Sequence, residues 1–337
     1  MVQVEEKKYQ ATGSPRRLVH ANMYAGDFQR SFDFYNQILG IEETFRIAED
    51  KVVFMSNGNT HHDLALVQVA QPGKVEESAG QVRPRKGRPD RPLQSGLNHI
   101  AFEMYNEAEL VAAFHRLDGA GVGPLGLEDR FVTRSIYFRD PEGHGLEFTA
   151  DMLTNWRDYR KPGVTVSHKP YVPEEEPPKT ETFVNLDPEV RRVDSAALHA
   201  KRSAHATIVA QDFPKLRQFY IEMVGLRELF MAPSGEFSVL QGKDYPGYSL
   251  VLASATAHRQ PGVHQVAYEL VSPEDFDGAG ERLAAKGVQV EYTIQHPRKQ
   301  VVCFRDPDGV LVQAYYEAPD FVEGLQEMDP ALALLLL

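Results

Sequence analysis

The sequence predicts an α+β protein of two tandem domains, each built from two repeated units of strands and one helix. Three observations support this prediction. The length of 337 residues suits two ordinary domains. A β-like run that carries a histidine, then an amphipathic helix, then further β-like runs recurs four times. Finally, motifs repeat between the two halves: 31–41 parallels 216–226, and 137–143 parallels 303–309.

The first unit, 17–70, shows how each element is recognised. Its opening strand is 20–24, where apolar and β-favouring residues surround a histidine. Asp27 is a suitable helix N-cap, apolar residues follow at three- and four-residue spacing, and Gly40 ends the helix. The unit closes with two further expected strands, 52–55 and 63–67.

The other three units repeat this order. The second unit, 97–150, has a tight turn at 140–143 between its last two strands. The third and fourth units, 203–254 and 262–317, form the second half of the chain. The segments that follow from this reading are an N-terminal extension (1–16), a first domain (17–155) with an insertion (71–96), a linker (156–200), a second domain (201–320) and a C-terminal tail (321–337).

Two irregular segments are rich in proline and charge. The linker 156–200 is interpreted as a connecting or wrapping arm. The insertion 71–96 is either disordered or forms a lid or oligomer contact near the site, and the sequence does not choose between these interpretations.

Composition limits the kinds of ligand and the cellular location expected for the chain. A net charge of −12 argues against nucleic acid as a ligand. The single cysteine, Cys303, forms no internal disulfide and suits a reducing cytoplasm, and the start of the chain has no apolar core typical of a secretory signal. The longest apolar run, 331–337, is far shorter than the roughly 20 residues of a membrane helix and is expected to dock on a neighbouring surface or fray.

Three residues stand out as candidate metal ligands. His20 and His99 lie on the opening strands of the first two units, and Glu147 lies on the closing strand of the second. Two imidazoles and one carboxylate can occupy one face of an octahedral metal and leave the opposite face for substrate and dioxygen. Because all three fall at repeat-equivalent places, the metal interpretation outweighs that of three separate hydrogen-bonded residues. Asn22, two positions after His20, would face the same side.

This pattern resembles the vicinal oxygen chelate superfamily, which includes glyoxalase I, bleomycin-resistance proteins and type I extradiol dioxygenases. The resemblance implies that two βαβββ modules pair into one open, cup-like mixed sheet with a metal inside. The first domain resembles the catalytic domain of the extradiol dioxygenases, so His20, His99 and Glu147 would be the metal ligands. By the same resemblance His62 would act as acid/base, and Tyr137 would bind a substrate oxygen, with His61 behind the site or exposed.

Three departures from the extradiol pattern stand in this sequence. A family histidine before the tyrosine has no counterpart in 127–131. The complete ligand set lies in the N-terminal rather than the C-terminal domain. The second domain has His205 and His264 but Gln313 in place of the carboxylate, which predicts a degenerate, structural domain. A site that pairs His205 with ligands of the first domain stays open as an alternative.

The resemblance implies an Fe(II)-dependent enzyme that cleaves a catechol-type aromatic diol with O2, located in the cytoplasm and forming a homo-oligomer. Mn(II), Ni(II) or Zn(II) are alternative metals. The main alternative function is an oxygen-independent, glyoxalase-like isomerase or lyase on the same fold. A non-catalytic binding protein is the third possibility, and tight metal binding would count against it.

Overall fold

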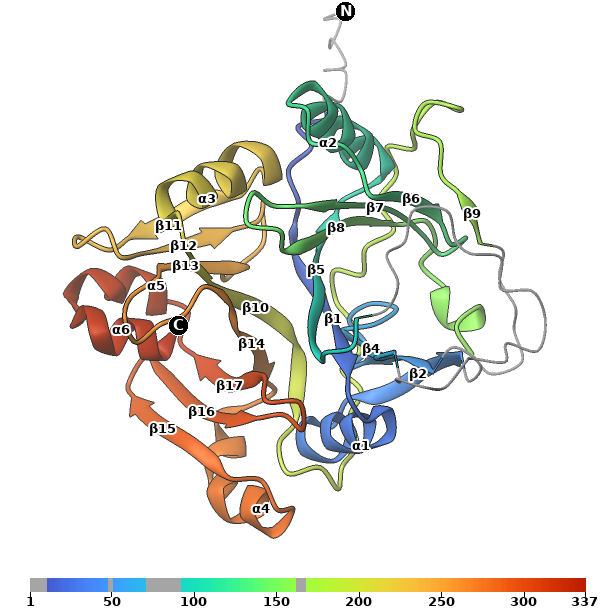
Figure 1. Ribbon diagram of the computed structural model, residues 1–337. Helices are drawn as coiled ribbons and strands as arrows, with labels where there is room; N and C mark the ends of the chain where they lie inside the picture. Colours follow the sequence, from blue (N-terminus) through green and yellow to red (C-terminus); the bar gives the residue numbers. More distant parts are fainter. Residues whose placement is uncertain (1–10, 48–50, 71–91, 162–167) are drawn as a thin grey trace, which may run out of the picture.

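The computed structural model describes residues 11–47, 51–70, 92–161 and 168–337, and its strands form two mixed sheets (Figure 1). In spatial order the first sheet consists of β2 (Glu42–Ile47), β3 (Val52–Ser56), β4 (Leu64–Gln68), β1 (Arg17–Ala25), β5 (Gly96–Met104), β8 (Gly145–Asp151), β7 (Thr133–Arg139), β6 (Gly126–Asp129) and β9 (Lys169–Pro170). The second consists of β11 (Arg227–Met231), β12 (Phe237–Gln241), β13 (Leu250–Ser254), β10 (Ala200–Ala210), β14 (Gly262–Leu270), β17 (Leu311–Glu317), β16 (Lys299–Arg305) and β15 (Val290–His296).

Helices connect the first and second strands of each module. These helices are α1 (Phe28–Leu39), α2 (Glu107–Gly119), α3 (Phe213–Phe219) and α4 (Ala279–Ala285), while α5 (Phe321–Gly324) and α6 (Pro330–Leu336) follow the last strand. The signals for α1 act as predicted: Asp27 accepts a hydrogen bond from the Arg30 backbone N–H, and Gly40 ends the helix at φ +71°, in the left-handed region. Strand β2 has no clear sequence signal, because its side chains are almost all partly exposed and do not alternate.

The two modules of each domain meet along a central antiparallel pair, β1–β5 in the first sheet and β10–β14 in the second. Parallel pairs flank this centre, with β4 beside β1 and β8 beside β5. The second sheet repeats the arrangement with β13 and β17. Each sheet keeps free edges, so neither closes into a barrel. The predicted fold class, two tandem α+β domains with open cup-like sheets, is confirmed.

The helix-covered faces of the two sheets pack against each other. One buried cluster joins Phe102 and Phe148 of the first sheet to Ile208 and Phe219 of the second domain. A second cluster joins α1 and β4 to β14 and β16. Burying a side chain of this size stabilises the fold by about 1.5–3 kcal/mol. Since these faces are used for packing between the domains, the opposite faces of the sheets form the cups.

Two tyrosine–aspartate hydrogen bonds cross between the domains. Tyr35 of α1 donates to Asp306 Oδ2 (2.9 Å), and Tyr220, just after α3, donates to Asp140 Oδ2 (3.0 Å). These four residues belong to the motifs that repeat between the halves. The other carboxylate oxygen of each aspartate accepts backbone N–H groups of its own turn. The turn at 140–143 therefore serves both as a turn and as a domain contact.

The segments outside the sheets are held against them. The arm after residue 168 contacts the first domain through backbone bonds from Val193 to Gly40 and from Arg191 to Asn57. Helices α5 and α6 lie along the second sheet (Figure 1), where Ala333 and Leu336 are buried in its core. The tail therefore docks, as expected. Most of the insertion, 71–91, lies outside the described residues, and among those that are described no helix is long and apolar enough to span a membrane.

Candidate metal centre

The backbone of the first sheet brings His20, His99 and Glu147 together. They lie on β1, β5 and β8, three adjacent strands. Ala21 and Met23 of β1 pack in the domain core, so strand alternation turns His20 to the opposite, cup face. The Nε2 atoms of His20 and His99 both approach Glu147 Oε2, at 3.1 and 2.9 Å.

The three donors fit a divalent cation. Their ligand atoms all lie within 4.8 Å of one another, and all three residues are buried. Burial alone would raise the pKa of Glu147, but hydrogen bonds and charge from His20 and His99 hold this pKa well below its ordinary value. Burial lowers the pKa of His20 more than Glu147 raises it. The site thus favours an anionic carboxylate beside a neutral imidazole, the protonation states that metal binding requires.

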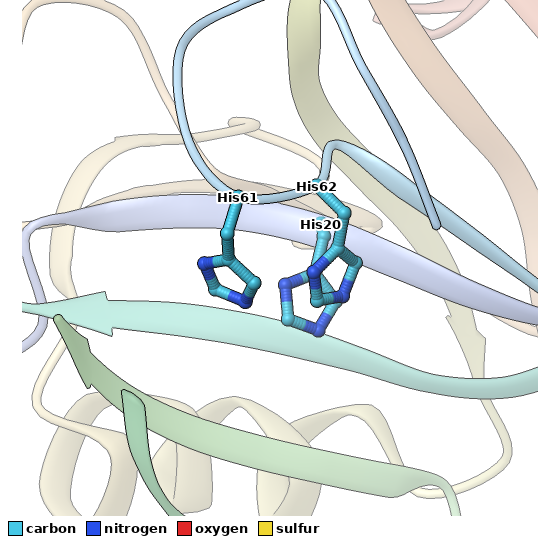
Figure 2. A group of neighbouring side chains, drawn as sticks. All are labelled: His20, His61 and His62. Atoms are coloured by element: carbon cyan, nitrogen blue, oxygen red, sulfur yellow. The ribbon is translucent and has the colours of Figure 1, made fainter. Parts of the chain in front are cut away.

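His62 and His61 approach the same site from the loop before β4 (Figure 2). The His62 ring lies 3.9 Å from the His20 ring, measured between centroids. Burial and the neighbouring imidazoles of His20 and His61 lower the pKa of His62 well below its ordinary value. His61 is only 5% exposed, so the exposed alternative is wrong: its Nδ1 lies 3.5 Å from Asp151 Oδ1.

Asp63 fixes the loop that carries these two histidines. Its buried carboxylate accepts hydrogen bonds from the Ser56 hydroxyl and the Asn57 backbone N–H, both at 2.9 Å. The Ser203 backbone N–H, from the second domain, approaches the other oxygen at 3.4 Å. Although burial raises the pKa of Asp63, these bonds favour its charged form. Asp63 therefore acts as a positioning residue for the His62 loop.

His20, His61 and His62 form a second set of donor atoms within 4.8 Å of one another. This set shares His20 with the first and has no carboxylate. Three neutral imidazoles would give a divalent cation no charge compensation, whereas Glu147 supplies one negative charge. We therefore centre the candidate metal site on Glu147 and place the other two histidines beside it.

Tyr137 lies on β7, paired with Glu147, and its ring is 5.5 Å from the His99 ring. The sequence predicted this residue at the site but missed two arginines near it. Arg130 forms an ion pair with Glu128. Burial lowers the pKa of Arg130, but the nearby Tyr137, Glu128 and Glu147 outweigh this effect and raise it. These charges lie where the sequence lacks the family histidine.

Arg160 is the other missed residue. It is 8% exposed, and its Nε has no hydrogen-bond partner among the described residues. Burial and the charge of Arg130 lower the pKa of Arg160 to about 10, with Tyr137 acting in the opposite direction. Arg160 follows β8 at the start of the linker, and it reaches the cup because the chain folds back there after the strand. Asn22 also has a buried amide oxygen with no partner among the described residues.

The second cup differs in its polar residues. His205 occupies the place of His20, since both lie opposite equivalent alanines, Ala267 and Ala101. The place of His99 is held by Gln265, and not by His264 as the sequence analysis expected. His264 is exposed on the other face, because a shift of one residue along a strand reverses the side of the sheet.

C-terminal residues fill this second cup. The backbone oxygen of Leu337 accepts hydrogen bonds from His205 Nε2 (2.6 Å) and from Gln265 Nε2 (3.0 Å). Tyr248 replaces His62, with its ring 4.5 Å from that of His205. Within the described part of the chain, both candidate metal-ligand groups belong to the first domain. His205 therefore does not join the ligands of the first domain, and the cross-domain alternative is wrong.

The chain belongs to the Glyoxalase/Bleomycin resistance protein/Dioxygenase superfamily. The family model matches residues 17–148 and 202–314, which is most of the chain and includes both sheets. The superfamily resemblance drawn from the motifs is thereby confirmed.

Its relatives fall into two groups. The chain is 22% identical over 325 residues to MhqA of Bacillus subtilis (strain 168), which is named as a ring-cleaving dioxygenase, covering 94% of this chain and 92% of that protein. It is 26% identical over 136 residues to biphenyl-2,3-diol 1,2-dioxygenase 3 of Rhodococcus globerulus, covering 40% of this chain and 63% of the relative. It is 25% identical over 131 residues to lactoylglutathione lyase of Escherichia coli O157:H7, covering 39% of this chain and 90% of the relative.

The similar solved structures also include both a dioxygenase and a glyoxalase. The 2,3-dioxygenase LapB from Pseudomonas sp. KL28 superposes with a TM-score of 0.63 and 14% identity, over 90% of this chain and 93% of that one. The Mn(II)-bound glyoxalase from Novosphingobium aromaticivorans gives a TM-score of 0.62 and 14% identity, over 90% and 83%. At this identity the likeness establishes the shared fold.

Proposed function

We propose that the protein is an Fe(II)-dependent extradiol dioxygenase that cleaves a catechol-type aromatic diol with O2. The observation that carries the proposal is the position of His62: a buried acid/base group lies against His20, next to a two-histidine, one-carboxylate set. The relatives named as ring-cleaving and diol dioxygenases support the same chemistry.

His20, His99 and Glu147 would hold the metal. This ligand set leaves open positions for substrate oxygens and dioxygen, and iron(II) bound there would withdraw charge from the diol and supply electrons to oxygen. Glu147 contributes one negative charge, and the two histidines contribute neutral nitrogen donors. Mn(II), Ni(II) and Zn(II) are the alternative metals for the same donors.

His62 would accept the second hydroxyl proton of the diol and later return a proton during ring opening. Its lowered pKa keeps the imidazole neutral near pH 7, so that it can act as a base. The product would be a semialdehyde in which the ring opens beside the diol.

Tyr137 and Arg160 would bind the oxygens of the substrate. The Tyr137 ring lies 5.5 Å from the His99 imidazole, which supports a role for its hydroxyl in hydrogen-bonding a substrate oxygen there. The buried guanidinium of Arg160 favours an anionic diol over a neutral one, because a charge in a low-dielectric cup interacts strongly.

Oxygen uptake tests the proposal. Anaerobically purified protein, reconstituted with Fe(II), is mixed with a panel of catechols while dissolved oxygen and a yellow ring-fission product are followed. We expect one oxygen consumed for each diol opened. A protein that binds the metal tightly and consumes no oxygen with any diol would contradict the proposal.

The second candidate function is an oxygen-independent, glyoxalase-like isomerase or lyase. The similarity to lactoylglutathione lyase and to a Mn(II)-bound glyoxalase favours it. Under anaerobic conditions, the Mn(II)- or Ni(II)-loaded protein would then convert the hemithioacetal of methylglyoxal and glutathione. The extradiol proposal expects no such conversion.

A further inference from the structure

A polar cavity lies outside the metal centre, where residues of the two domains meet. It is a cleft of about 580 Å³. Its walls are the starts of β5 and β14, the turns of the β7–β8 and β16–β17 hairpins, and the segment 258–261. The volume lies in the range of small-molecule sites, which is about 300–1,000 Å³.

The cleft follows the internal repeat of the chain. Leu97 and Val263 lie at the second positions of the equivalent strands β5 and β14, and both line it. Arg139 and Arg305 come from the repeated hairpin motif, one from each domain, and both line it as well. The two halves of the molecule therefore each bring a guanidinium to the same cavity.

The lining is strongly basic, although the whole chain has a net charge of −12. Its basic residues are Arg139, Arg259, Arg305, His144, His258 and His264. The lining contains one carboxylate, Asp308, whose oxygens accept hydrogen bonds from the Gly26 backbone N–H and the Ser31 hydroxyl.

Two of the guanidiniums lack a carboxylate partner within the described residues. Arg139 donates to the Gly143 backbone oxygen, and Arg259 donates to that of Ser254. Arg305 is paired with Glu291 in an exposed contact, where an ion pair is weak. Donor groups on these side chains therefore remain for a ligand.

Two imidazoles of this lining differ in their electrostatic surroundings. Burial and the charges of Arg259 and Arg305 lower the pKa of His264. For His144, burial acts downward but the Asp140 carboxylate, 2.7 Å away, outweighs it and raises the pKa. His264 therefore lies beside two cationic side chains in this cleft, and not at the metal-ligand place expected from the sequence.

We propose that this interdomain cleft binds a small anion that carries phosphate or carboxylate groups. Guanidinium groups match the planar, two-oxygen face of both groups and form charge-assisted hydrogen bonds with them. Apolar lining residues such as Leu97 and Val263 would contact the body of an organic anion. The site is separate from the cup and does not depend on the proposed dioxygenase activity.

Calorimetric titration of the metal-loaded full chain tests this proposal. Inorganic phosphate and citrate are the two probes, at about 0.1 M sodium chloride to screen distant charges. We expect saturable binding of at least one probe, which also identifies the chemical group preferred. Absence of saturable binding of both probes would overturn the proposal.

Variants locate the binding. The double substitution Arg139→Gln with Arg305→Gln should weaken binding at least tenfold, and so should Arg259→Gln with His264→Gln, which leaves both hairpins intact. The charge-matched control is Arg192→Gln with Lys215→Gln, two exposed positions outside the cleft. Equal weakening in the control, or unchanged affinity in both cleft variants, would overturn the proposal.

Discussion

His61 and His62 are adjacent in the sequence but meet different partners. The His62 ring lies against His20, whereas His61 points to Asp151. The sequence predicts His62 through its resemblance to a family motif, and its ring lies beside His20, one of the proposed metal ligands. The sequence does not predict that Arg160 lies in the cup, because nothing near that residue marks it as part of the site.

Replacing His62 should separate metal binding from turnover. The His62→Ala variant should retain the metal, because His20, His99 and Glu147 remain, and lose about 10²–10⁴ in kcat as expected for a missing acid/base group. Metal content and oxygen uptake measure the two effects. His115→Ala, an exposed histidine on α2, is the control. Turnover at the wild-type rate in the His62 variant would refute the assigned role.

Replacing Arg160 should affect substrate binding. We expect Arg160→Gln to raise KM for the diol about tenfold, the loss of one charge-assisted hydrogen bond, while the metal content stays unchanged. Steady-state kinetics across a pH series measure it, and the increase should be smallest where the diol binds in its neutral form, because the charge of Arg160 favours the anion. Arg192→Gln, on the exposed arm, is the control. An unchanged KM would show that Arg160 does not contact the substrate.

At the scale of elements, repeat and periodicity predicted most of the fold. The caps of α1, the strands β1, β3 and β4, and the pairing of units into two domains are read from local signals and repeated motifs. The register of strand β14 is less well predicted from the sequence. The first histidine of each unit makes His264 the apparent counterpart of His99, whereas strand pairing assigns that place to Gln265. This shift of one residue along the strand turns the side chain to the other face of the sheet.

Contacts between elements far apart in sequence were not visible in the motifs. Tyr35 and Asp306 each belong to a recognised motif, but their hydrogen bond joins the first module to the fourth. Removing the hydroxyl in Tyr35→Phe leaves a buried carboxylate with one bond fewer. We expect the free energy of unfolding to fall by about 1–3 kcal/mol, measured by urea denaturation.

Tyr220→Phe should have a similar effect at the pseudo-equivalent bond to Asp140. Tyr159→Phe, a partly exposed tyrosine, is the control and should change little. If both interdomain variants were as stable as the wild type, these bonds would not hold the domains together.

At the scale of the whole molecule, the two cups have diverged. One gathers histidines and a carboxylate, and the other is filled by C-terminal residues bound to His205 and Gln265. The sequence predicted a degenerate second domain from Gln313, but it gave no reason to place the tail inside the cup. That contact depends on the path of the last helices.

Buried imidazoles should make the metal-free molecule sensitive to acid. Burial lowers the pKa of His20, His62 and His205 below the ordinary 6.5. As the pH falls below about 6.5, the unfolded chain takes up protons that the folded chain does not, so stability is complete above this pH and decreases below it. The expected slope is up to about 1.4 kcal/mol per pH unit for each histidine.

Urea denaturation of the metal-free protein between about pH 7 and pH 5 measures this decrease. The His205→Gln variant removes one of the three groups without touching the metal centre, and its pH dependence should be correspondingly weaker. A urea midpoint that stays constant over this range would contradict the prediction that the buried histidines are neutral.

The most direct test of the account is the metal content of the chain after equilibrium dialysis, measured by mass spectrometry. We predict one Fe(II) or Mn(II) per chain in the wild type. Glu147→Ala should lose most of it, whereas Gln313→Ala, the equivalent change in the second cup, should keep it. An unchanged metal content in Glu147→Ala, or loss in Gln313→Ala, would contradict a catalytic metal held by His20, His99 and Glu147.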